Sequence, residues 1–117
     1  MSLAYSSENL PRGVLLHIRG EVDLASARDL EDQLLHHLDQ GHDVIADFSD
    51  VSYFDMSGVH VFERCSGIFR EKHRALVIVD ASPVVQKVFR IIGFSAVSVA
   101  MNKEEALALL RGIDHGE

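Results

Sequence analysis

Apolar and polar residues alternate along the chain with two different periods, and segments of one period are separated by segments of the other. Some segments place apolar residues at every second position or in a short unbroken run, which is typical of strands. These are residues 13–22 (GVLLHIRGEV), 43–48 (DVIADF), 74–80 (RALVIVD) and 96–100 (AVSVA). The second and third are apolar nearly throughout, which predicts strands covered on both faces.

Other segments space apolar residues three or four positions apart, as on one face of a helix. These are residues 23–41, 57–73, 82–94 and 102–112. In the first, we expect the inward positions to be Leu24, Ala27, Leu30, Leu34 and Leu38, with Gly41 closing the helix. In the second, the inward positions are Val61, Cys65, Ile68 and Phe69. Ser82 and Asn102 are expected to cap the third and fourth helices, and Gly93 to follow the third.

Strands that alternate with helices predict an α/β fold, with a mixed sheet of about four to five strands and about four helices packed against it. The 117 residues are 47% apolar, so one domain, residues 1–117, can bury a core without disulfides or metals. The single cysteine, Cys65, fits a reducing compartment. No secretory signal pattern and no apolar run of about 20 residues is present, which predicts a cytoplasmic chain without membrane insertion.

Acidic residues outnumber basic ones by 18 to 11, and the formal net charge is −7. Such a surface repels nucleic-acid phosphates, so we expect no direct binding to DNA or RNA. A role in transcription would have to act through another protein.

The segment DMSG, residues 55–58, lies between a strand-like and a helix-like run. In the simpler interpretation Ser57 is the N-cap of a helix that starts at Gly58. The same geometry also suits a phosphorylation site, because a helix N-terminus tolerates an added anion. Asp55 would hold the loop through an Asx-type hydrogen bond, and Gly58 would let a second protein approach the hydroxyl.

Three segments together resemble the STAS domain family, and most closely its anti-sigma factor antagonists: IRGEVDLASARDL, VIADFSDVSYFDMSGVHVF and ALVIVDASPVVQKVFRIIGF. The resemblance covers about residues 10–111 and implies a single STAS domain. In that family the motif opens the second helix, and its second small residue is the serine that a cognate anti-sigma factor kinase phosphorylates. That position is Ser57 here.

The resemblance implies partner switching. The unphosphorylated domain would bind an anti-sigma factor, which is also its serine kinase, and so free a sigma factor. Phosphorylation of Ser57 would release the domain, and a PP2C-type phosphatase would restore it. A loss of about 3–4 kcal/mol on phosphorylation would lower the affinity several hundredfold.

Other positions match the family pattern. Asp23 stands where the family has an acid at the end of a strand, close to the phosphorylated loop and able to contribute to kinase docking. Asp55 and Gly58 match the first and last residues of the motif, and Ser82 with Pro83 matches the start of the third helix. Met56 departs from the small polar residue that the family usually has, and its soft side chain suits a protein interface.

The remaining candidate residues give weaker indications of a function. His60, three residues after Ser57, could bias the phosphate charge or contact a partner, but the pattern favours an ordinary helix-surface histidine. The other polar-flanked histidines are expected on solvated surface: His36, His37, His42, His73 and His115. Neither a metal-ligand spacing, a nucleophile elbow nor a phosphate loop is present, so we expect no metal, no cofactor and no enzyme activity.

Two alternatives stay open. One is a STAS subunit that does not switch, in a lipid-transport or larger signalling assembly, where the same surface is a permanent contact. The other is a small-ligand sensor of the same fold, which requires a pocket and a ligand-dependent melting shift. Whether the chain forms a homodimer is also left open.

Overall fold

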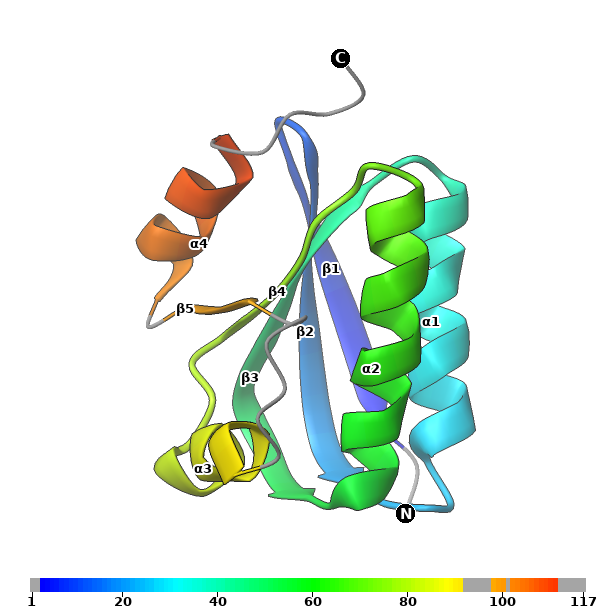
Figure 1. Ribbon diagram of the computed structural model, residues 1–117, viewed down its shortest axis with the longest axis vertical. Helices are drawn as coiled ribbons and strands as arrows, with labels where there is room; N and C mark the ends of the chain where they lie inside the picture. The colour runs from blue at the N-terminus through cyan, green and yellow to red at the C-terminus, as the bar shows by residue number, and fades with distance from the viewer. Residues whose placement is uncertain (1–2, 92–97, 101, 112–117) are drawn as a thin grey trace.

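The computed structural model describes residues 3–91, 98–100 and 102–111. They form, in chain order, strands and helices with the following bounds: β1 Ala4–Leu10, β2 Gly13–Val22, α1 Ala27–Asp39, β3 Asp43–Phe54, α2 Met56–Glu71, β4 Leu76–Val79, α3 Pro83–Ile91, β5 Ser98–Ala100 and α4 Lys103–Arg111. The predicted α/β fold is confirmed (Figure 1).

The strands form one mixed sheet of five, in the order β1-β2-β3-β4-β5. β2 to β5 are mutually parallel, whereas β1 runs antiparallel to β2 through a tight turn that pairs Leu10 with Gly13. β1 was not predicted, because its sequence AYSSENL is mostly polar and exposed and shows no apolar period. Pairing with β2 holds this edge strand in the sheet, and Tyr5 and Leu10 add partly buried side chains that pack against the core.

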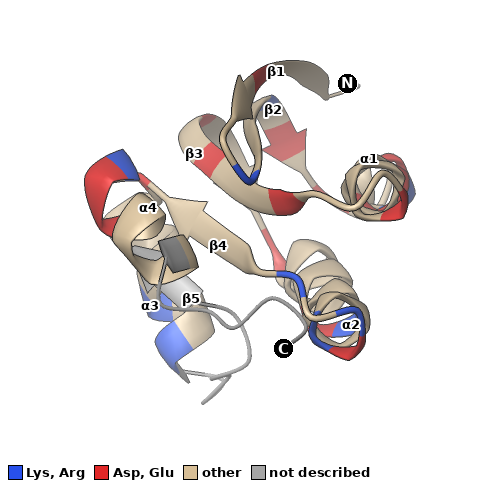
Figure 2. Ribbon diagram, turned by 90° about the horizontal axis from the view of Figure 1, so that it is seen from above, with Lys and Arg blue, Asp and Glu red and all other residues tan. Residues whose placement is uncertain are grey.

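The core lies on both faces of the sheet, and α4 is separated from α1 and α2 by the sheet (Figure 1, Figure 2). Along β3, Val44 and Ala46 join the larger cluster under α1 and α2, while Ile45 joins the smaller cluster under α4. This alternation confirms that the run 43–48 is a strand covered on both faces. In the described part of the chain, no helix is both long and apolar enough to span a membrane.

The first predicted helix begins later than its pattern indicated. Asp23 and Ser26 bond to each other's backbone: Ser26 N–H donates to Asp23 Oδ1 at 3.1 Å, and Asp23 N–H donates to Ser26 Oγ at 3.0 Å. This turn delays α1 to Ala27 and leaves the Leu24 side chain 83% exposed, so the inward position predicted for Leu24 is wrong.

Three predicted helix ends are confirmed: the end of α1 at Gly41 and the starts of α3 and α4 at Ser82 and Asn102. Gly41 has φ of +82° and donates to Leu38 O at 2.8 Å, while His42 N–H reaches back to His37 O at 3.2 Å, which is a Schellman ending of α1. Ser82 Oγ caps α3 and Asn102 Oδ1 caps α4. The predicted positions Gly93, 96–97, 112 and His115 lie outside the described residues.

Candidate functional site

The candidate site is the edge of the sheet where β2 and β3 end. Val22 pairs with Phe54 at the last step of the parallel ladder, so the loops that follow them leave the sheet side by side. Asp55 N–H donates to Val22 O at 3.3 Å and ties the two loops together. Asp23 is thereby placed next to the motif, as predicted, although its carboxylate is occupied in holding Ser26.

Asp55, and not Ser57, is the N-cap of α2. The backbone of Asp55 is extended, its Oδ1 accepts a hydrogen bond from Ser57 N–H at 2.9 Å, and its carbonyl accepts from Gly58 N–H at 3.0 Å. The predicted Asx-type hydrogen bond is thus present, and through it Asp55 caps α2, the role that the simpler interpretation gave to Ser57. That interpretation is wrong because Asp55 is the last residue with an extended backbone after β3, and α2 therefore begins at Met56.

This shift of the cap frees the Ser57 hydroxyl. Ser57 lies in the first turn of α2, is half-buried, and its hydroxyl makes no hydrogen bond to any described residue. Among the described residues, no general base is hydrogen-bonded to this oxygen. The helix N-terminus around it carries partial positive charge, which can accommodate a phosphate.

Gly58 is needed for packing inside the domain. It is buried, and a Cβ at this position would lie 2.5 Å from Phe54 Cε1 and 2.7 Å from Val22 Cγ1. The missing side chain therefore faces the core. This corrects the sequence-based explanation, in which the glycine made room for a second protein.

Large apolar side chains are exposed beside the motif, and of these the sequence indicated only Met56 as a contact residue. Leu24 follows β2, Tyr53 is the last residue but one of β3 and Met56 begins α2, and their side chains are 83%, 51% and 45% exposed. We call these three residues the apolar edge. The exposure of Leu24 could have been predicted from the turn that Asp23 forms with Ser26. A residue inside that turn cannot lie on the buried face of α1.

Carboxylates surround the apolar edge. The pKa of Tyr53 is raised, first by the charge of Asp55 and further by Asp23 and Glu21. These three acids therefore lie close enough to the exposed phenol to act on it. The surface combines an apolar patch with an acidic rim, which is typical of a protein contact site rather than a catalytic pocket.

The remaining candidates do not join this arrangement. His60 is exposed on α2, with Nδ1 3.4 Å from Glu63 Oε1, and lies one turn beyond Ser57. Cys65 is fully buried, as predicted, and burial raises the pKa of its thiol to about 12. Within the ranges that the structure describes, no group of three or more His, Cys, Asp or Glu side chains could hold a metal ion.

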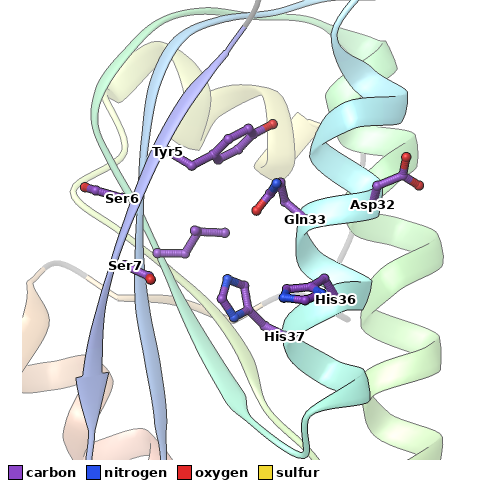
Figure 3. Close-up of a pocket in the computed structure, with 8 residues that line it drawn as sticks. Tyr5, Ser6, Ser7, Asp32, Gln33, His36 and His37 are labelled. Carbon is purple, nitrogen blue, oxygen red and sulfur yellow. The ribbon is translucent and has the colours of Figure 1, made fainter.

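One histidine contradicts the prediction of solvated surface. His37 is only 9% exposed, although His36 and His73 are exposed and His42 is half-buried. The side chain of His37 lies under β1, the strand that the sequence pattern missed (Figure 3).

Comparison with known proteins agrees with this geometry. The family model of the STAS domain matches residues 4–106. The anti-sigma-B factor antagonist of Bacillus subtilis (strain 168) is 28% identical over 92 residues, which cover 79% of this chain and 84% of that protein.

Solved structures show the same fold. The anti-sigma factor antagonist SpoIIAA in its unphosphorylated form superposes with a TM-score of 0.71 at 24% identity, covering 94% of this chain and 100% of that chain. The Bacillus cell fate determinant SpoIIAA in the phosphorylated form gives a TM-score of 0.68 at 24% identity, covering 92% and 100%.

Proposed function

We propose that this chain, which belongs to the STAS domain family, is an anti-sigma factor antagonist that changes partners with the phosphorylation state of Ser57. The observation that carries the proposal is the Ser57 hydroxyl, which lies in the first turn of α2 beside the exposed Met56 and makes no hydrogen bond within the described part of the chain. The similarity to an anti-sigma-B factor antagonist, and to a structure of SpoIIAA in a phosphorylated form, supports it.

In the unphosphorylated state, the apolar edge docks on an anti-sigma factor that is also a serine kinase. Burial of Leu24 and Met56 supplies the hydrophobic contact, because both side chains are exposed in the free domain, Leu24 almost completely and Met56 by nearly half. The acids Asp23 and Asp55 form the rim, where they favour a basic patch on the partner. The anti-sigma factor then releases its sigma factor.

Phosphorylation reverses this binding without unfolding the domain. Because Asp55 and not Ser57 caps α2, modification of the Ser57 hydroxyl removes no hydrogen bond between residues that the structure describes. The phosphate adds about −1.5 to −2 charges to a surface that already holds two carboxylates, in a chain with net charge −7. In the complex this charge would be desolvated beside an apolar contact, so the partner is released. A PP2C-type phosphatase restores the hydroxyl.

The test is the affinity of the purified cognate kinase for Ser57→Ala and Ser57→Asp, measured by calorimetry with ADP present. We expect Ser57→Ala to bind like the unmodified chain and Ser57→Asp to bind at least about tenfold more weakly, which corresponds to about 1.4 kcal/mol. Ser49→Asp is the charge-matched control, because Ser49 is exposed on β3 away from the motif, and it should bind like the wild type.

Equal affinities of the kinase for Ser57→Ala and Ser57→Asp would contradict the switching mechanism. Mass spectrometry of the protein recovered from its own cells, under stressed and unstressed growth, provides the second measurement. A Ser57 that carries no phosphate under any condition would favour a permanent STAS subunit instead.

A further inference from the structure

The end of β3 that leads into the motif has less support than the rest of the sheet. β4 pairs with β3 only along residues 44–47, so among the described strands residues 50–54 are paired with β2 alone. Two register shifts interrupt that pairing, one just after His17 and one just after Gly20, whose φ is +120°. We call residues 50–54 the β3 extension. Because Asp55 follows it directly, the position of the α2 cap depends on this weakly paired segment.

One histidine side chain bridges the first register shift. His17 Nδ1 lies 3.0 Å from Asp47 Oδ2, before the shift, and His17 Nε2 lies 2.8 Å from Asp50 Oδ2, after it. Asp47 is the last residue of β3 that pairs with β4, and Asp50 is the first residue of the β3 extension. The ring therefore links the β3 extension to the part of β3 that is paired on both sides.

The complete bridge requires a protonated ring. A carboxylate only accepts hydrogen bonds and a neutral imidazole has one N–H, so only the imidazolium can donate to Asp47 and Asp50 at once. The hydrogen bond to Asp47 raises the pKa of His17, partial burial opposes this, and the hydrogen bond to Asp50 adds to the rise. The bridge is therefore complete below pH about 6.5 and is lost as the pH rises through the folded-state pKa.

Other charged groups on this face of the sheet do not replace the bridge. On β1, Ser6 lies opposite His17 in register, and Glu8 bonds to Lys103 of α4, with 3.3 Å between Oε2 and Nζ. Arg19, two residues further along β2 on the same face, keeps its charge at every pH that the fold tolerates. Among these described groups, His17 is the one whose charge changes near neutral pH.

We propose that protonation of His17 sets the position of the β3 extension and, through it, of the α2 cap, so that the segment carrying Ser57 changes conformation with pH. The change reaches the cap because Asp55 N–H donates to Val22 O at the end of the same ladder. This device goes beyond the proposed function and does not depend on phosphorylation of Ser57.

The test is an NMR pH titration of the full chain from about pH 5 to about pH 8.5, which spans an ordinary and a raised histidine pKa. We expect the amides of Asp55 and Ser57 to shift in one step whose midpoint equals that of the His17 ring protons. Val22, which pairs with Phe54, lies roughly 16 Å beyond His17 along β2, farther than a charge acts through water at physiological salt. A step at Asp55 therefore reports movement of the backbone and not the direct field of the ring.

Two variants should abolish the step at Asp55 and Ser57 for different reasons. His17→Gln removes the titrating ring. Asp50→Asn keeps the bridge at every pH, because its amide N–H can donate to Nε2 of a neutral ring while Nδ1–H donates to Asp47. The Asp50 side chain is 50% exposed, so this second variant does not put folding at risk.

His60→Gln is the matched control, because it removes an exposed ring that lies one turn beyond Ser57 and contacts Glu63. It should leave the step unchanged. A step confined to the amides of His17 and its two carboxylate partners would overturn the proposal, because it would indicate an isolated ion pair. Persistence of the step in His17→Gln or Asp50→Asn, or its loss in His60→Gln, would overturn it as well.

Discussion

Replacement of Gly58 by alanine tests the packing beneath the motif. The added Cβ would lie 2.5 Å from Phe54 Cε1 and 2.7 Å from Val22 Cγ1, whereas carbon atoms in contact stay about 3.5–4.0 Å apart. Neither neighbour can move freely. Phe54 is 7% exposed and packs against other phenylalanine rings at centroid distances of 5.4 to 6.3 Å, and Val22 is fully buried.

The expected magnitude follows from two opposing effects. Overpacking of a core costs about 1–3 kcal/mol, while alanine in place of glycine in a helix contributes about 0.5–1 kcal/mol of stability. Gly58→Ala should therefore lower the free energy of unfolding by about 1–2 kcal/mol, or lower Tm by about 3–10 °C for a domain of this size. A shift of Phe54 would also move Asp55, the next residue and the cap of α2.

Gly67→Ala is the control, because Gly67 lies in the same helix and a Cβ there meets nothing within 4 Å. It should raise stability by about 0.5–1 kcal/mol. Urea denaturation monitored by circular dichroism measures both variants, and their difference isolates the overpacking cost. If Gly58→Ala proves as stable as Gly67→Ala, the packing explanation of this glycine is refuted.

Other perturbations test the cap, a charged pair and the core. Asp55→Ala should cost about 1 kcal/mol in urea denaturation and Asp55→Asn much less, because asparagine also caps; equal losses would contradict capping. The pKa of His17 is raised, first by Asp47. Protonated His17 therefore stabilises the fold fully below pH about 6.5, and this contribution is lost as the pH rises through the folded-state pKa. Tm should fall over the same pH range, and His17→Gln should make that fall smaller. Cys65, with its buried thiol, should react with a thiol reagent at pH 8 only as the chain unfolds in urea; rapid labelling of the native protein would argue against the packed core.

The sequence by itself determined the features that depend on near neighbours. The period of apolar residues located β2, β3, β4 and the helices, because burial on one face follows directly from the geometry of a strand or a helix. Gly41, Ser82 and Asn102 marked helix ends for the same reason, since a cap bonds to backbone only a few residues away.

The tertiary structure decided whatever depends on residues far apart in the chain. β1 forms because β2 offers it a free edge. The position of β1 then buries His37 and leaves a groove between β1 and α1, and the residues next to His37 in the sequence predict neither. His17 meets carboxylates 30 and 33 positions later, through the register of β2 with β3.

At the motif, local chemistry allowed either Asp55 or Ser57 to cap α2. The choice was made by the length of β3, whose pairing with β2 extends to Phe54 and leaves Asp55 as the first residue free to cap. Strand register therefore leaves the Ser57 hydroxyl outside the cap of α2, and this register arises from contacts across the sheet that the four residues of the motif do not determine alone.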